Sequence, residues 1–159
     1  MATNYQINGP LRVAKIMHSM LLAAVFIYAL LLFALLPSRD FPPVFGTGDP
    51  ALTFLEALLA LMSLTSLAAG YFWIRLLVKG YKRNKNNPQT QGPLAIQILR
   101  AALFESVAIY GLVLGILGAE WQISLAFFVV SAAALVLSFP TEERWKRMME
   151  SINTNSIPE

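Results

Sequence analysis

Four long apolar segments follow one another along the chain, separated by short stretches that hold most of the polar residues. They cover Ile16–Leu36, Leu52–Val78, Leu94–Leu117 and Ile123–Phe139. An α-helix rises about 1.5 Å per residue, so about 20 residues cross the hydrocarbon core of a bilayer. The alternating pattern of a membrane β-strand does not occur in these segments. The pattern therefore predicts an all-α, polytopic membrane protein whose four transmembrane helices form an antiparallel bundle.

The composition agrees with this pattern. Of the 159 residues, 57% are hydrophobic and 13% are charged, whereas soluble domains carry about 25% charged residues. The net charge of +3 is too small, and too confined to helix ends, to follow a nucleic-acid backbone. We therefore expect the lipid bilayer, and no nucleic acid, as a partner.

Basic residues mark the parts of the chain that face the cytoplasm. They gather before the first apolar segment, between the second and third (79–85), and after the fourth (144–147). The other two connections hold one basic residue between them, Arg39. Cytoplasmic loops carry an excess of Lys and Arg. We predict one membrane domain over 1–159 in the cell (inner) membrane, with both termini cytoplasmic and a cytoplasmic tail over 140–159.

Two proline-containing stretches predict helix boundaries. Asp49 and Pro50 have the residue types of a helix N-cap and first helical position. Pro140 is expected to end the fourth helix, and Thr141–Glu150 to form a short amphipathic helix at the membrane surface.

Glu105 is the main candidate for a functional residue because it lies near the middle of the third apolar segment. A charged side chain at the bilayer centre costs about 3 kcal/mol on insertion scales. Removal from water favours the neutral acid, and we expect Ser63, Thr65 and Ser66 of the second segment to lie level with it and to donate hydrogen bonds. The pattern predicts a proton- or cation-binding site, with a structural acid that only joins helices as the open alternative.

Other polar residues in the apolar segments have a simpler interpretation. Arg75, Arg100 and His18 are expected at the cytoplasmic interface, where long side chains reach lipid headgroups. For Arg100, a salt bridge to an acid of another subunit is the alternative. The chain has no cysteine, no metal-ligand spacing and no recognisable catalytic motif. We expect no metal, no cofactor and no enzymatic activity.

Small residues predict where helices approach one another closely. Gly111 and Gly115 are four residues apart in the third segment, where Ala108 precedes them, and Gly70 lies in the second. We predict that these residues let the second and third helices pack tightly, with Glu105 in or beside the contact. Three serines at seven-residue spacing predict another contact face on the fourth helix: Ser124, Ser131 and Ser138.

The stretch Phe104–Val113, FESVAIYGLV, resembles the ion-binding helix of the proteolipid (c) subunits of F-type and V-type rotary ATPases. In that family a mid-membrane Glu or Asp precedes an Ala-Ile-Tyr-Gly-Leu-like stretch, and a polar cytoplasmic loop lies one helix-length upstream, where this chain has Asn87–Gly92. The resemblance implies that Glu105 matches the ion-binding carboxylate and Tyr110 the aromatic residue that follows it. It covers the central hairpin, and the flanking first and fourth segments do not fit the family.

These observations predict a small integral-membrane subunit of a larger energy-converting membrane complex, in contact with other membrane subunits. Its proteolipid-like hairpin would hold Glu105 for a proton or a cation. Two alternatives stay open. One is a purely structural accessory subunit. The other is a stand-alone small transporter, which is less favoured because a single mid-membrane charge is too little to form a substrate pathway.

Overall fold

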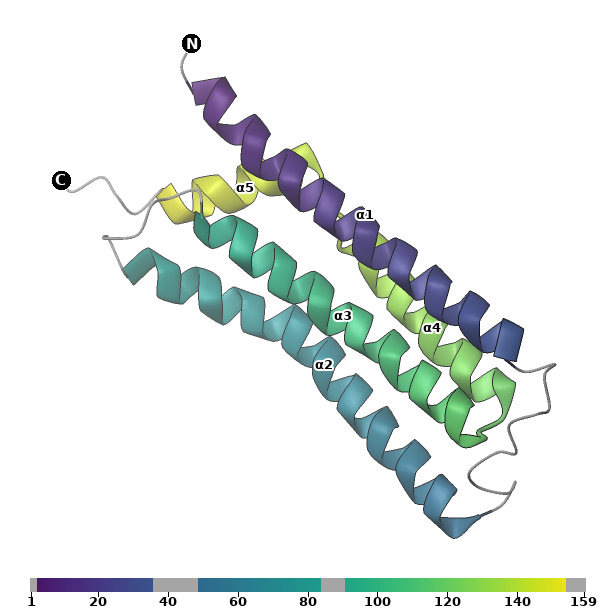
Figure 1. Ribbon diagram of the computed structural model, residues 1–159. Helices are drawn as coiled ribbons and strands as arrows, with labels where there is room; N and C mark the ends of the chain where they lie inside the picture. Colours follow the sequence, from purple (N-terminus) through teal and green to yellow (C-terminus); the bar gives the residue numbers. More distant parts are fainter. Residues whose placement is uncertain (1–2, 36–48, 84–90, 154–159) are drawn as a thin grey trace.

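The computed structural model describes residues 3–35, 49–83 and 91–153, and within these ranges the chain is all helical (Figure 1). Side chains are described for 9–34, 49–72 and 93–148. The helices are α1 (Thr3–Leu35), α2 (Pro50–Arg83), α3 (Gln91–Leu117), α4 (Trp121–Leu137) and α5 (Glu142–Asn153). The all-α prediction is confirmed for the described residues.

Three of these helices contain stretches that are long and apolar enough to cross a membrane. The stretches are Gly9–Ala34 in α1, Pro50–Phe72 in α2 and Pro93–Leu117 in α3. The shorter α4 has 17 residues, and it qualifies only together with α5, from which it is bent by 70°. The three long helices indicate a membrane protein.

Large apolar side chains cover much of the outer surface of the helices. Phe26 and Phe33 of α1, Phe54 of α2 and Leu137 of α4 each expose more than half of their surface, from 59% to 72%. Soluble monomers rarely expose apolar patches larger than a few hundred Å². Lipid chains, or the apolar faces of other membrane proteins, solvate such a surface well, so the exposure agrees with a membrane location.

Helix α3 lies at the centre and packs against α1, α2 and α4, while α5 lies near the end where α1 and α3 begin (Figure 1). The main apolar cluster joins α1, α3 and α4. It contains the buried residues Val25, Leu32, Ala101, Phe104, Ala108, Phe128 and Leu135. The position of every other helix is therefore set by its contact with α3 or with a neighbour of α3.

Glycines mark two of the closest approaches to α3. A Cβ atom added to Gly70 of α2 would lie 2.5 Å from Cε1 of Phe104, so α2 meets α3 there as predicted. A Cβ on Gly111 of α3 would lie 2.6 Å from Cβ of Phe127 and 3.0 Å from the carbonyl oxygen of Ser124, both on α4. At Gly111 the contact with the α4 backbone leaves no room for a side chain, whereas at Gly70 the ring of Phe104 would have to move.

The partner predicted for the Gly111 and Gly115 pair was wrong. Gly111 packs against α4, and a Cβ on Gly115 would lie 2.5 Å from Leu32 of α1. Near this end of α3, the α2 helix contributes larger side chains, because Leu59 belongs to the same apolar cluster as Leu114. The small residues of α3 thus allow α4 and α1, rather than α2, to come close.

Helices α3 and α4 form a hairpin with a tight turn. Gly118 has a φ of 110°, a backbone conformation that side chains with a Cβ rarely adopt. The N–H of Ala119 donates to the carbonyl oxygen of Leu114 at 3.0 Å, as in a Schellman motif. The turn returns the chain along α3 within a few residues.

The first helix begins well before the first apolar segment. α1 begins at Thr3 and not near Ile16, because its first turns carry Leu11 and Ala14, which pack against Trp145 of α5. α5 confirms the short helix expected after Pro140.

The start of α2 agrees with the sequence. The N–H of Ala51 donates to Oδ1 of Asp49 at 2.8 Å, which is the N-cap bond expected when Pro50 is the first helical residue.

Some predictions fall outside the described residues. These are the connections at 36–48 and 84–90, which include most of Asn87–Gly92, and the end of the tail at 154–159. The side chains of Arg75 and of the basic residues at 79–85 also lie outside the described part.

We predict that Gly111→Ala lowers the stability of the protein by about 1–3 kcal/mol, because the added methyl group overpacks the α3–α4 contact. Gly9→Ala is the matched control, since nothing lies within 4 Å of a Cβ at Gly9, and it should leave stability unchanged or raise it slightly. Thermal unfolding of the purified variants in detergent measures both. Equal stability of the two variants would contradict the α3–α4 packing.

Candidate functional site

Glu105 forms a hydrogen bond with a tyrosine from another helix. It lies at the midpoint of the apolar stretch Pro93–Leu117 of α3, and the hydroxyl of Tyr28 on α1 donates to its Oε1 at 2.9 Å. Both side chains are half-buried. A carboxyl group can accept this bond whether it is ionised or protonated, because an acceptor oxygen remains in both states. The bond thus holds the acid in place without fixing its protonation state.

The helical geometry explains why Glu105 meets α1 instead of α2. Phe104 contacts Gly70 of α2, and successive residues on an α-helix are rotated by about 100°. Glu105, one residue further along, is therefore turned away from α2 and towards α1.

The polar residues predicted around Glu105 on α2 make other contacts. Thr65 is exposed and donates its hydroxyl to the carbonyl oxygen of Leu61, one turn back on its own helix, at 2.8 Å. Ser63 is buried, and its Oγ has no hydrogen-bond partner among the described residues. Ser66 is half-buried. The structure does not connect Ser63 or Thr65 to Glu105.

Tyr110, the aromatic residue implied by the family resemblance, also lies apart from the carboxyl group. It packs against the apolar cluster that contains Leu52, Leu59 and Leu114. Five residues on a helix correspond to about 500°, or 140° beyond one full turn, so Tyr110 and Glu105 occupy different faces of α3. The observed tyrosine partner comes instead from the flanking helix α1.

His18 is a polar residue of the core whose position the sequence did not reveal. It is only 1% exposed, so its side chain packs inside the bundle and does not reach out to lipid headgroups as expected. Its Nε2–H donates to the carbonyl oxygen of Leu135 on α4 at 2.7 Å, and its ring meets Phe139 edge-on at 5.3 Å. Nδ1 has no partner among the described residues. A neutral ring with its proton on Nε2 fits these contacts.

The serine face predicted on α4 is confirmed. Ser124, Ser131 and Ser138 are all buried, at 0%, 0% and 2% exposure. The hydroxyl of Ser131 donates to the carbonyl oxygen of Phe104 at 2.7 Å, and the side-chain amide of Gln97 donates to the carbonyl oxygen of Ser138 at 2.9 Å. Polar contacts thus link α3 and α4 at two levels.

No group of three His, Asp or Glu side chains in the described part of the chain is placed to hold a metal ion. The described acidic side chain in the middle of an apolar stretch is Glu105, and its nearest polar contact is a tyrosine.

The chain matches no protein-family model, no curated protein and no solved structure. The resemblance of Phe104–Val113 to proteolipid subunits therefore stays a hypothesis that depends on this stretch alone. The role of the protein has to be inferred from the geometry around Glu105.

We predict that Tyr28→Phe lowers stability by about 0.5–1.5 kcal/mol, because it removes one interhelical hydrogen bond. In a Glu105→Ala background the same substitution should cost nothing, since its acceptor is gone. Thermal unfolding of the four proteins in detergent gives this coupling energy.

Tyr110→Phe is the matched control for this cycle. It removes the same hydroxyl from a tyrosine on another face of α3, so its effect should be equal with and without Glu105. A coupling for Tyr110 as large as that for Tyr28 would contradict the assigned contact.

Proposed function

We propose that the chain is a small integral-membrane subunit of a larger energy-converting membrane complex, in which Glu105 binds a proton or a cation. The observation that carries this proposal is the hydrogen bond from Tyr28 to a carboxyl group at the midpoint of an apolar helix. Ionisable residues inside membranes are costly and are most often part of ion or proton pathways. The proposed role includes no catalysis of a covalent reaction.

The proposed topology has four spans, with α4 and the bend into α5 as the fourth. The basic residues in the N-terminal part of α1, those at 79–85 around the end of α2, and those of α5 then lie on the same side of the membrane, which the positive-inside rule makes the cytoplasmic side. Both termini would be cytoplasmic, and Glu105 would lie near the middle of the bilayer of the cell membrane.

Reversible protonation requires a carboxyl group that is held in place and still reachable. Tyr28 holds one oxygen of Glu105, while the half-buried state of the side chain leaves part of the group at the surface of the chain. A neighbouring membrane subunit can reach that surface and offer or remove a proton. The need for such a neighbour favours a subunit of a complex over a stand-alone transporter.

The resemblance to proteolipid subunits supports a mid-membrane ion site but not the same arrangement of its partners. In this chain the tyrosine that contacts the carboxyl group comes from α1, a helix outside the proteolipid-like hairpin. We therefore propose an ion-binding subunit built on a related local pattern, and not an ordinary rotor subunit.

A purely structural accessory subunit is the second candidate. The observation that favours it is that Tyr28 and Glu105 join α1 to α3, which is what a helix-joining acid would do. The two candidates differ in what Glu105 contributes once the complex is assembled.

We predict that Glu105→Gln abolishes the proton- or cation-coupled activity of the complex, because the amide can accept the bond from Tyr28 but cannot bind and release a proton. Co-purification of the tagged chain with its partners should be unchanged. A carbodiimide that modifies protonated carboxyl groups in apolar surroundings should label the wild-type chain at Glu105.

Glu120→Gln is the matched control, because Glu120 is exposed in the turn between α3 and α4. It should retain both activity and labelling. Full activity of Glu105→Gln would refute ion binding. Loss of co-purification would favour the structural role, because the complex would then fail to assemble.

The topology is tested separately. We predict that reporter fusions at both termini, and at the connection between α2 and α3, report a cytoplasmic location. Fusions at the other two connections should report the opposite side. A C-terminus on the side opposite to the N-terminus would show that α4 and α5 do not cross the membrane.

A further inference from the structure

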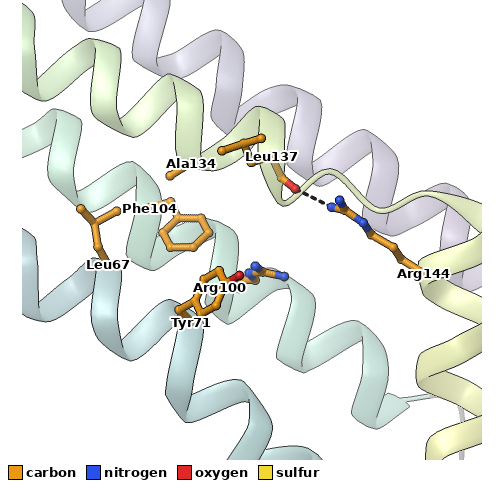
Figure 2. A pocket seen from close by; sticks show the side chains of 7 residues that line it. All are labelled: Leu67, Tyr71, Arg100, Phe104, Ala134, Leu137 and Arg144. Carbon is orange, nitrogen blue, oxygen red and sulfur yellow. Dashed lines mark hydrogen bonds between the residues drawn. The ribbon is translucent and has the colours of Figure 1, made fainter.

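A cavity of about 560 Å³ lies between α2, α3 and the junction of α4 with α5 (Figure 2). This volume is within the range of small-molecule binding sites. Arg100 of α3 and Arg144 of α5 form its polar part, and Leu67, Phe104 and Ala134 form an apolar wall. The cavity is therefore amphipathic, with two positive charges at one side of an apolar surface.

Arg100 has no anionic partner in the described part of the chain. Its guanidinium carbon lies 5.9 Å from the ring centroid of Tyr71 and 5.5 Å from that of Phe104. Its buried Nε has no hydrogen-bond partner among the described residues. Arg100 is half-buried, and an aromatic ring attracts a guanidinium less strongly than an anion that forms charge-assisted hydrogen bonds, so an anion would stabilise this position.

The described acidic side chains of α5 do not supply that anion. Arg144 donates through Nη1 to the carbonyl oxygen of Leu137, which leaves other N–H groups of its five available. On α5, Glu142 pairs with Lys15 at 3.7 Å and Glu143 with Arg147 at 3.5 Å. The two cavity arginines thus face an anion site that the described acids do not fill.

A second, apolar cavity lies further along α3, and we call the two cavities together the groove. A second cavity of about 230 Å³ shares Leu67 with the first and is also lined by Val107, Phe127 and Val130. From Arg100 to Val107, α3 rises by about 10 Å. The groove therefore runs from two positive charges into an apolar channel between α2 and α4.

We propose that this groove binds an anionic phospholipid. The phosphate lies between Arg100 and Arg144, and one acyl chain lies along Leu67, Val107 and Phe127. Guanidinium groups bind phosphate oxygens in pairs, and basic pockets between membrane helices hold anionic headgroups. A free phosphate would use only the arginine end, and a carboxylate of a partner protein would leave the apolar channel without an occupant.

This site is separate from Glu105. Arg100 and Phe104 face the cavity beside α2 and α4, whereas Glu105 bonds to Tyr28 of α1. Lipid binding can therefore succeed or fail in a test independently of ion binding at Glu105.

Native mass spectrometry of the purified full chain in detergent tests the proposal, with dioleoyl phosphatidylglycerol and dioleoyl phosphatidylcholine added at equal concentration. We expect retention of phosphatidylglycerol and little retention of phosphatidylcholine. Arg100→Gln and Arg144→Gln should each weaken phosphatidylglycerol binding by about tenfold, as expected for the loss of a charge-assisted hydrogen bond.

Arg147→Gln is the matched control, because it removes the same charge from α5 at an exposed position outside the cavity. It should leave phosphatidylglycerol binding unchanged. Equal retention of the two lipids, or an equal loss in Arg147→Gln, would overturn the proposal and assign the effect to general surface charge.

Two further measurements test the lipid chain. Val130→Trp fills the apolar channel from a partly exposed position on α4, and it should weaken phosphatidylglycerol binding while thermal unfolding shows a folded protein. Inorganic phosphate at millimolar concentration should not displace the lipid. Unchanged lipid binding in Val130→Trp, or displacement by phosphate alone, would overturn the acyl-chain placement and indicate a site for a free anion.

Discussion

Polar side chains between apolar helices have no water to bond with, so each one needs a partner within the protein or from outside it. This constraint accounts for most of the polar contacts of α3. Glu105 receives the hydroxyl of Tyr28, and the carbonyl oxygen of Phe104 receives that of Ser131. Gln97 bonds to the backbone of Ser138. Where the described residues supply no partner, as at Nε of Arg100, a ligand can supply one.

The two proposed sites use different faces of one helix. Glu105 is turned towards α1, whereas Arg100 and Phe104 line the groove beside α2 and α4. Helix α3 packs against all three of these helices. Both proposed sites therefore include side chains of this one central helix. A bound lipid would also fill the two cavities that lie between α2 and α4.

The helices and their small residues could be predicted from the sequence, but the neighbours of each residue could not. Apolar run length identified α2 and α3, and the residue types of Asp49 and Pro50 identified the N-cap, because these features depend on local sequence. The contact between Tyr28 and Glu105 depends on the rotation of α1 against α3, and no local pattern encodes that rotation. For the same reason the sequence did not reveal that the His18 side chain is buried against Leu135.

The short fourth helix bears on the thickness of the surrounding membrane. At about 1.5 Å per residue, the 17 residues of α4 extend about 25 Å, which is less than the roughly 30 Å hydrocarbon core of a typical bilayer. If α4 crosses the membrane, the lipids beside it must compress locally, and the deformation costs less where the bilayer is already thin. The 70° bend into α5 would then place an amphipathic helix over the thinned part of the bilayer. The protein would favour thin regions of the membrane. Partner helices with similarly short spans would pack on its α4 side.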